Sequence, residues 1–407
     1  MSKLEECERQ LFLKQLQINR LLDITQAINN NVKAEGLFDM YKSFLSWELG
    51  VRKLALFIPE IGSWHCVVHE GIEKEELEQK DINKLLASFG NTLTKLQNNK
   101  HPLAAHFDMV IPVFHKEKPI AYAFIGGYDA TDFSKVQLIT TITNITAVAI
   151  ENKRLFKRQI EQERFNHEMT LAGEMQRSLV PDKLPKNGTF EVSAIYKPHF
   201  GVGGDYFDCF KYQEDHYMFI VADIAGKGLS AALLMANFQA NLHAIVRRAT
   251  SPEEFIRQLN KAVWRVTKSE RFITMFAADI DTKTGHLRYV NAGHMPPILI
   301  TKGETHLLKK GCPILGFFKS LPALEIGEVM IDDEALLLIF TDGITDIRNA
   351  EGEDFNEDLV IQFTELNKNL SARPFNEKLM QHIDTFRGSE EYPDDITVLT
   401  TQFFKKI

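Results

Sequence analysis

The sequence predicts an α+β protein that consists of two domains. A length of 407 residues suggests two or three domains. A composition of 44% hydrophobic and 25% charged residues is typical of globular proteins with sizeable cores. Helical and strand-like periodicities occur in two groups, which Pro181 and Pro185 separate. We therefore expect helices that cover mainly antiparallel sheets in each group.

The first group of elements spans roughly 150 residues, a normal domain size. Leu4, Leu11, Ile18, Leu21 and Ile28 recur at near-helical spacing and predict an opening helix. Short apolar runs separated by turn residues then predict strands. We expect a second helix at 34–49, strands at 53–59, 63–69, 107–114 and 118–127, and a closing helix at 132–156.

The closing helix is expected to continue toward the second group. Ile145, Val148, Asn152 and Leu155 follow spacings of three and four residues, and the pattern resumes at Phe165. One interpretation is a short coiled coil at 151–180 that joins two domains and two subunits, with Asn152 setting its register. The other is a single amphipathic helix packed on its own domain.

The second group alternates strands and helices. Two apolar runs flank a polar turn with a glycine at 276–293, which predicts a hairpin. The expected strands are 190–198, 216–223, 272–281, 286–294, 335–343 and 396–404, and the expected helices are 230–249, 252–268, 357–366 and 375–386.

Charge and cysteine content exclude several classes of function. A net charge of −8 argues against a nucleic-acid binder, which needs concentrated Lys and Arg. The four cysteines form no CxxC pair, so neither a zinc knuckle nor a redox dithiol is indicated. We find no signal-peptide core and no run of about 18 apolar residues. We therefore expect a soluble cytoplasmic protein that does not span a membrane.

Aspartates recur beside glycines or strand ends in the second domain. Asp205 follows "GVGG", Asp223 ends the run "YMFIVAD", Asp342 ends "LLLIFTD", and Asp394 and Asp395 precede "ITVLT". Strand ends of a sheet can converge, and carboxylates gathered there repel one another unless a cation neutralises them. Oxygen donors favour Mg²⁺ or Mn²⁺ over zinc or copper. Two such ions suit the hydrolysis of a phosphate ester by water, and no P-loop motif offers an alternative.

Six motifs then establish a resemblance over about residues 170–405. They are "EMQRSLVPDKLP", "GVGGDYFD", "VADIAGKGLSAALLMA", "YVNAGHMPPIL", "TDGITDIRNAEGEDF" and "PDDITVL", in this order. Together they resemble the bacterial PPM-type serine/threonine phosphatases of the SpoIIE class, which are related to protein phosphatase 2C. The resemblance implies an α-β-β-α sandwich at 181–407, in which two antiparallel sheets flanked by helix pairs hold two Mn²⁺ or Mg²⁺ ions.

The resemblance also implies roles for individual residues. Asp205, Asp223, Asp342 and Asp394 would bind the metals, with Asp223 bridging both ions, and the backbone carbonyl of Ile224 would add a ligand. Asp205 and Asp223 are thereby the expected catalytic residues. Asp208 and Asp395 would contact the metal ligands without binding the metals themselves.

Three further positions in these motifs leave questions open. Eukaryotic relatives carry a histidine where this chain has Ala225, which leaves the proton donor unassigned. Lys227 either contacts phosphate or is a solvated or structural residue. His294 is either a catalytic base or a structural residue of its motif.

The first domain, at 20–150, resembles a GAF sensor domain in its order of elements, with a PAS-like domain as the competing interpretation. Residues 1–19 would form a separate N-terminal helix. GAF domains bind small ligands or dimerise, so a small-molecule ligand is expected but not identified. Cys66 is expected to be a core thiol, and Trp64 and His65 either line a pocket or pack.

Taken together, the sequence predicts a sensor-regulated, metal-dependent protein serine/threonine phosphatase. By resemblance, its substrate would be a phosphoserine or phosphothreonine on a STAS-type anti-anti-sigma-like regulator, and the chain would form a homodimer through the GAF-like domain and the helix at 145–180. A catalytically silent pseudophosphatase that acts as a ligand-gated adapter is the alternative. A two-metal hydrolase of small phosphate esters is a further one.

Overall fold

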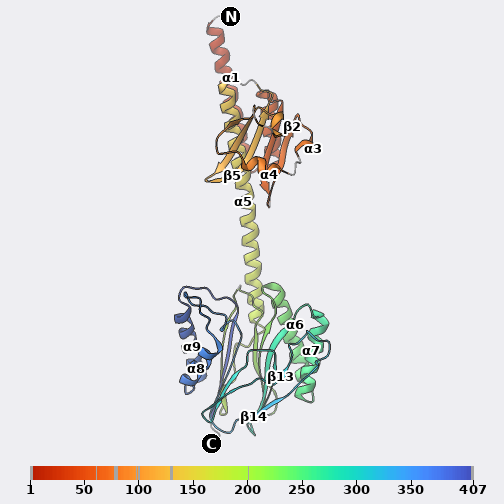
Figure 1. The fold of residues 1–407 in the computed structure, drawn as a ribbon, viewed down its shortest axis with the longest axis vertical. Coiled ribbons are helices and arrows are strands. Elements are labelled where there is room, and N and C mark those ends of the chain that lie inside the picture. Colours follow the sequence, from red (N-terminus) through yellow and green to blue (C-terminus); the bar gives the residue numbers. More distant parts are fainter. Residues whose placement is uncertain are drawn as a thin grey trace. The chain divides into compact units, whose positions relative to one another are not determined.

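The chain divides into two compact units, Met1–Glu163 and Arg164–Ile407. The computed structural model describes residues 3–60, 62–77, 81–97, 99, 101–128, 132–199 and 201–404. Both units combine helices with antiparallel strands, so the predicted α+β class is confirmed. Figure 1 labels the elements of each unit.

The first unit contains a five-stranded antiparallel sheet in the order β2-β1-β5-β4-β3. Its strands are β1 (Lys53–Glu60), β2 (Ser63–Glu70), β3 (Thr94–Lys95), β4 (Met109–His115) and β5 (Lys118–Gly126). Its helices are α1 (Lys3–Asn29), α2 (Ala34–Ser43), α3 (Lys74–Leu77), α4 (Ile82–Ala87) and the first part of α5 (Phe133–Arg177), with a π-helical turn at Phe44–Glu48 and a 3₁₀ turn at Ala104–His106.

Helices cover both faces of this first sheet. Strand side chains alternate between faces, so Leu54 and Leu56 pack with α1, α2 and α5 on one side. Phe57 packs with α3 and α4 on the other side. The sequence analysis did not predict α3, α4 or β3, which are too short to show a period.

Helix α5 is 45 residues long and continues past Glu163, where the first unit ends, as the periodicity predicted. Its middle section carries exposed apolar side chains at Leu155, Phe156 and Ile160. These three side chains are 47%, 62% and 49% exposed. The choice between a coiled coil and a lone amphipathic helix therefore stays open.

The second unit contains two sheets. One has the order β13-β10-β9-β8-β7, with β14 paired to β10, and the other has the order β12-β11-β15-β16-β6. All described pairs are antiparallel except β10 with β13. The strands are β6 (Phe190–Lys197), β7 (Tyr206–Gln213), β8 (His216–Ile224), β9 (Ile273–Asp281), β10 (His286–Ala292), β11 (Ile298–Thr301), β12 (Glu304–Leu307), β13 (Gly311–Cys312), β14 (Gly327–Met330), β15 (Ala335–Phe340) and β16 (Ile396–Phe403).

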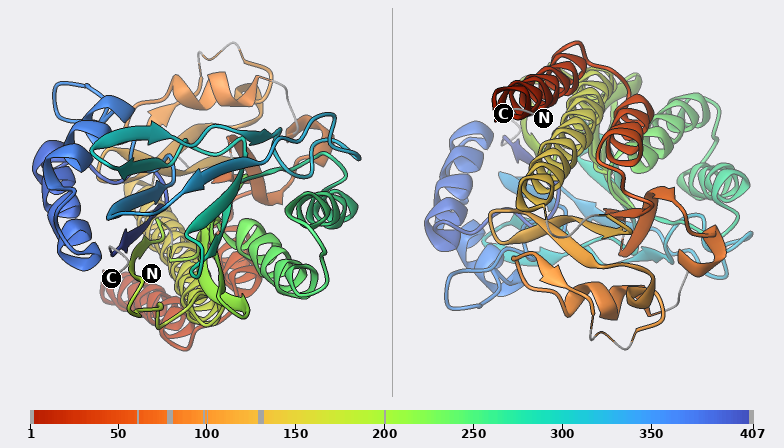
Figure 2. Two further views of the ribbon diagram at one scale, coloured as in Figure 1. Left: turned by 90° about the horizontal axis from the view of Figure 1, so that it is seen from below. Right: turned by 90° about the horizontal axis from the view of Figure 1, so that it is seen from above.

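Three apolar layers hold the second unit together. Helices α6 (Leu229–Val246) and α7 (Pro252–Thr267) pack on the β7–β10 sheet. Helices α8 (Glu357–Asn367) and α9 (Ala372–Arg387) pack on the other sheet. Between the sheets lies a third cluster, to which Phe219 and Leu337 contribute from opposite sides. Figure 1 and the two views of Figure 2 show the helix pairs on opposite sides of the strands.

Two described helices are long and apolar enough to cross a membrane, namely α5 and α6. Both also bury apolar residues in a core, as Ile139 of α5 and Met235 of α6 illustrate. A core helix passes the same test of length and composition, so this is weak evidence for a membrane. The expected absence of a membrane span stays a prediction.

Candidate metal centre

The four aspartates expected to bind metal lie at strand ends of the two sheets in the second unit. Asp205 directly precedes β7, and Asp223 is the penultimate residue of β8. Asp342 follows β15 by two residues, and Asp394 precedes β16 by two. Each sheet thus contributes two of the four carboxylates.

Hydrogen bonds tie Asp205 to the opposite sheet. The Oδ2 atom of this buried carboxylate accepts bonds from the Thr341 hydroxyl at 2.8 Å and the Thr397 hydroxyl at 2.6 Å. The Thr397 amide in turn donates to the Thr341 hydroxyl oxygen at 3.0 Å. Thr341 is the neighbour of Asp342, so these bonds bring the aspartates of the two sheets together.

Mutual repulsion among the carboxylates appears in their pKa values. Burial raises the pKa of Asp223 to about 7, and the charges of Asp342, Asp394 and Asp395 add to this effect. Burial and the charge of Asp223 raise the pKa of Asp205 well above its usual range. The pKa of Asp342 is raised as well, by burial first and then by Asp346 and Asp394. Such a cluster favours the uptake of a cation or of protons.

Close contacts, with a side chain in one case and with the backbone in the other, explain two of the glycines before Asp205. A Cβ atom on Gly203 would lie 2.5 Å from Asp395 Oδ2, and one on Gly204 would lie 2.6 Å from the Ile224 carbonyl oxygen. Only Gly201 has a positive φ, of 77°. A backbone turn at positive φ therefore falls on Gly201, whereas Gly203 and Gly204 provide room for close approach. The Ile224 carbonyl thus lies beside the residue that precedes Asp205.

Asp395 holds the loop that precedes Asp205. Its Oδ1 atom accepts a bond from the His199 amide at 2.7 Å, and its Oδ2 atom accepts one from the Gly204 amide at 2.6 Å. Asp208 behaves differently, because it accepts bonds from the Tyr206 hydroxyl at 2.6 Å and from His243 of α6 at 2.9 Å. Its bonds therefore link β7 to α6, and the described contacts give it no part in the aspartate cluster.

Gln176, in the last turn of α5, also holds this loop. Its side-chain amide donates to the Gly203 carbonyl at 2.6 Å and accepts from the Gly203 amide at 3.0 Å. The side chain is buried. The sequence motif included Gln176 but gave no reason to single it out, because both of its partners are backbone atoms.

Two basic residues flank the glycine loop after Asp223. The Lys227 ammonium pairs with Asp394 Oδ2 at 2.9 Å and donates to the Pro393 carbonyl at 3.1 Å. This bond to Asp394 raises the pKa of Lys227. The Arg271 guanidinium donates to the Ser230 hydroxyl at 2.9 Å and lies over Gly226, where an added Cβ would be 3.1 Å from it. The sequence analysis missed Arg271, which no motif marks.

His294 lies close to the centre without facing solvent. It is buried, and its Nδ1 atom is 3.0 Å from the hydroxyl of Thr274, which pairs with Asp223 across β8 and β9. Burial lowers the pKa of His294 to about 4, so the ring is neutral at physiological pH. These contacts favour the structural interpretation over a catalytic base.

The donor set fits a hard divalent cation. It consists of carboxylate and carbonyl oxygens, which Mg²⁺ and Mn²⁺ prefer, and burial together with the neighbouring carboxylates raises the pKa of Asp205 and of Asp223. Within the described residues, however, no three His, Cys, Asp or Glu side chains are already spaced to hold a metal ion. The Lys227 ammonium instead contacts Asp394. Metal binding would therefore require side-chain movement.

Comparison with known proteins identifies the class of the second unit. Residues 213–404 match the family model of stage II sporulation protein E (SpoIIE). This part of the chain is therefore similar to SpoIIE-type phosphatase domains of the protein phosphatase 2C class, as its motifs predicted.

Individual relatives agree with this assignment. The chain is 28% identical over 265 residues to protein IcfG of Synechocystis sp. (strain ATCC 27184 / PCC 6803 / Kazusa), which covers 57% of this chain and 41% of that protein. It is 27% identical over 198 residues to the phosphoserine phosphatase RsbU of Bacillus subtilis (strain 168), covering 48% of this chain and 58% of that protein. The chain thus matches about half the length of these curated relatives.

A solved structure supports the fold. The SiaA-PP2C domain of Pseudomonas aeruginosa superimposes with a TM-score of 0.54 at 20% identity and covers 61% of this chain and 99% of that one. At this level of identity the likeness shows the fold alone.

Proposed function

We propose that the chain is a metal-dependent protein serine/threonine phosphatase. The observation that carries this proposal is the meeting of Asp205 and Asp223 from one sheet with Asp342 and Asp394 from the other, in a cluster whose carboxylates repel one another. When bound, two Mn²⁺ or Mg²⁺ ions would lower the pKa of a shared water and polarise a phosphoryl group.

The chain's own residues prepare the site in distinct ways. The hydroxyls of Thr341 and Thr397 fix the orientation of the Asp205 carboxylate. Asp223, Asp342, Asp394 and the Ile224 carbonyl would complete the ligand set. Asp205 and Asp223 have the deepest burial of the four carboxylates, and burial keeps competing water away from their oxygens.

Arg271 and Lys227 are the residues that would face the substrate phosphate. Both lie on or over the loop that follows Asp223. A guanidinium matches the oxygens of a phosphate bidentately, and an ammonium acts as a point charge. To contact phosphate, the Lys227 ammonium would give up its present partner Asp394.

We further propose that the phosphatase domain at 181–407 follows a GAF-like sensor at 20–150 and a linker helix at 151–180. The five-stranded sheet with helices on both faces supports the sensor assignment, and the layers of helices and sheets in the second unit support an α-β-β-α sandwich. The exposed apolar residues of α5 support a homodimer. The name of the RsbU relative, phosphoserine phosphatase, supports a phosphoprotein substrate. We propose a STAS-type regulator for that role, in the cytoplasm.

The direct test is Mn²⁺-dependent phosphate release from a phosphoserine protein. We expect Asp223→Asn to lose on the order of 10²-fold or more in kcat/KM, as the loss of a ligand to a nucleophile-generating metal would cause. The exposed Asp358 of α8 offers a matched control, because Asp358→Asn makes the same chemical change at a helix position outside the cluster and should retain activity. Equal rates in wild type and Asp223→Asn would remove Asp223 from the mechanism.

The ion pair between Lys227 and Asp394 favours one alternative function. An adapter without catalysis would keep such a pair permanently, since the ammonium stabilises the carboxylate without a metal. Wild-type inactivity with Mn²⁺, Mg²⁺ and several phosphoproteins, together with tight binding of a phosphoprotein, would support the adapter over the enzyme.

A further inference from the structure

Exposed apolar side chains surround Arg271 in the second unit. Four of them are 38–65% exposed, and we call these four the apolar rim: Leu229, Leu233, Phe272 and Phe317. Single exposed apolar residues are ordinary on protein surfaces, whereas a group of them at one place marks an interaction surface. The backbone and side-chain contacts of Arg271 bring the four residues together.

Two members of the rim lie on the first turns of α6. The Arg271 guanidinium donates to the hydroxyl of Ser230 at 2.9 Å, and Ser230 directly follows Leu229. Residues four apart on a helix are neighbours on one face, so Leu229 and Leu233 lie together. Both leucines and Ser230 are exposed, which places the two apolar side chains on the solvent side of α6, next to Arg271.

Phe317 reaches Arg271 from another segment of the chain. Ile273 and Leu315 exchange two backbone hydrogen bonds, of 3.0 and 2.9 Å, in an antiparallel bridge. Two residues further out, this pairing places Phe317 opposite Arg271. A Cβ atom on Gly316 would accordingly lie 3.4 Å from the Arg271 carbonyl oxygen. Phe317 therefore belongs to the same surface as the two leucines.

Phe272 joins the rim to the metal centre. It directly follows Arg271, and its carbonyl accepts a hydrogen bond from the Ala225 amide at 3.0 Å. Ala225 lies two residues after Asp223, in the glycine loop over which Arg271 is placed. The rim therefore borders the loop at which the phosphate would bind.

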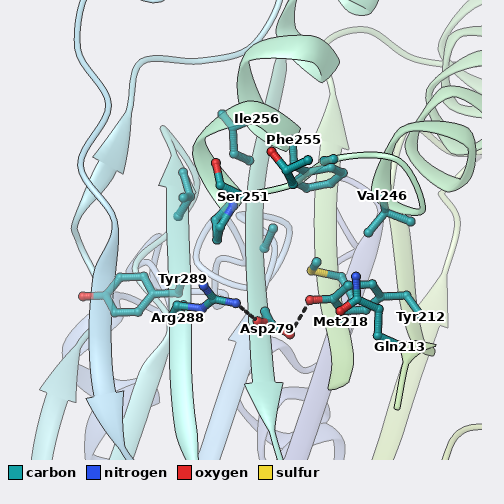
Figure 3. A pocket seen from close by; sticks show the side chains of 15 residues that line it. Tyr212, Gln213, Met218, Val246, Ser251, Phe255, Ile256, Asp279, Arg288 and Tyr289 are labelled. Atoms are coloured by element: carbon teal, nitrogen blue, oxygen red, sulfur yellow. Dashed lines mark hydrogen bonds and ion pairs between the residues drawn. The ribbon is translucent and has the colours of Figure 1, made fainter. Parts of the chain in front are cut away.

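The cavity at the opposite end of α6 has no part in this surface (Figure 3). It lies against Val246 and Phe255 and measures about 90 Å³, whereas ligand pockets typically span about 300–1,000 Å³. Its Arg288 is bonded to Asp279 at 2.7 Å, as Figure 3 shows. This guanidinium is already paired, whereas that of Arg271 is bonded to a neutral hydroxyl.

We propose that the apolar rim is the docking surface for the protein substrate, and that this substrate carries apolar side chains next to its phosphoserine. The inference rests on the proposed phosphatase function, in which Arg271 faces the substrate phosphate. Successive residues of an extended peptide lie about 3.4 Å apart, so the neighbours of a phosphoserine held at Arg271 reach the rim. A second copy of the chain fixed on the rim would cover Arg271 and exclude the phosphate. The occupant is therefore a partner that arrives with the phosphate.

The test compares two synthetic phosphoserine peptides, one with leucines on both sides of the phosphoserine and one with serines in their place. Both are hydrolysed by the full chain with Mn²⁺, alongside p-nitrophenyl phosphate, which has no neighbouring residues to contact the rim. We expect the kcat/KM of wild type to be about tenfold or more higher for the leucine peptide, because docking removes apolar surface from water.

Leu233→Gln should lower this ratio between the peptides to about threefold or less, since it removes apolar contact area and adds no charge. Leu233→Met should keep most of the ratio. Leu366→Gln is the matched control, because Leu366 is an exposed leucine of α8, outside the rim, and its replacement should leave the ratio unchanged. Thermal unfolding checks that the three variants fold.

Two failures are distinguishable. If wild type hydrolysed p-nitrophenyl phosphate but both peptides with equal kcat/KM, the docking proposal would be overturned and the phosphatase function would stand. If wild type hydrolysed none of the three substrates, both would be overturned. An unchanged peptide ratio in Leu233→Gln, together with a lower molar mass in sedimentation, would assign the rim to a second copy and also overturn the proposal.

Discussion

Gly204 offers the sharpest test of how the site is built. A Cβ atom at this position would lie 2.6 Å from the Ile224 carbonyl oxygen and 3.5 Å from that of Gly226. An ordinary contact begins near 3.4 Å, so Gly204→Ala must separate the two backbone segments by about 0.8 Å. The Gly204 amide is also bonded to Asp395 at 2.6 Å, which restricts the direction in which the loop can move.

The displacement falls on Asp205, the next residue, and on the carbonyl of Ile224. A misplacement of about 1 Å in an active site can cost on the order of 10²-fold in rate, so we expect kcat/KM to fall roughly 30- to 100-fold. Overpacking of this kind costs about 1–3 kcal/mol of stability. The assays are Mn²⁺-dependent hydrolysis of p-nitrophenyl phosphate and of a phosphoserine protein, with urea unfolding alongside.

Gly188→Ala is the matched control. A Cβ atom there would meet no heavy atom within 4 Å, and its φ is not in the left-handed region. We expect activity within about twofold of wild type, because exposed substitutions of this kind change little. If Gly204→Ala kept full activity on both substrates, the tight apposition of Gly204 and Ile224 would not be needed for the site, and the reasoning would be refuted.

Three other predictions concern charge and capping. With divalent ions chelated, the free energy of unfolding should fall as pH rises from about 4 to about 7, because the unfolded chain releases the Asp223 proton near pH 4 whereas folding raises the pKa of Asp223 to about 7, so the folded state keeps the proton over this range. Urea unfolding at pH 5 and pH 8 measures this, and Asp223→Asn should lessen the difference. Lys227→Met should tighten Mn²⁺ binding roughly fivefold by calorimetry, the equivalent of about 1 kcal/mol for an exposed ion pair with Asp394, and weaker binding would contradict it. Ser251→Ala should cost about 1 kcal/mol in urea unfolding, since the Ser251 hydroxyl caps α7 by accepting from the Glu254 amide at 3.2 Å; an unchanged midpoint would show that the cap contributes nothing.

Much of the fold was predictable because its long elements have clear periods. The four major helices of the second unit and six of its strands were expected from the sequence. Strand β7 was missed, because Tyr206–Gln213 mixes buried and charged residues after a run of glycines. The short strands from β11 to β14 were missed because two to four residues show no period.

The part of the candidate site that lies at strand ends was predictable from the sequence. Asp205, Asp223, Asp342 and Asp394 could be grouped because sheets bring strand ends together, and their roles as ligands stay a prediction. The resemblance implied that Asp208 supports the metal ligands, but its described hydrogen bonds run to Tyr206 and His243. The strand that begins between Asp205 and Asp208 directs Asp208 toward His243, and only the folded sheet reveals this.

Residues that act through backbone atoms or distant partners could not be found in the same way. Gln176 bonds only to main-chain atoms of Gly203, and Arg271 acts from the far end of a connection after α7. Neither residue type is unusual for its position in the sequence. Their contribution depends on tertiary contacts between segments 27 and about 40 residues apart.

The paired hydrogen bonds between the Gln176 side chain and the Gly203 backbone fix the end of α5 to the loop that precedes Asp205. Because the same side-chain amide donates one bond and accepts the other, a movement of the last turn of α5 would also move Gly203. These bonds connect the last turn of α5 directly to Gly203, two residues before Asp205. Gln176→Glu would keep the bond from the Gly203 amide and replace the bond to the Gly203 carbonyl with a repulsion between two oxygens. This would weaken the connection between α5 and the loop while leaving the helix intact.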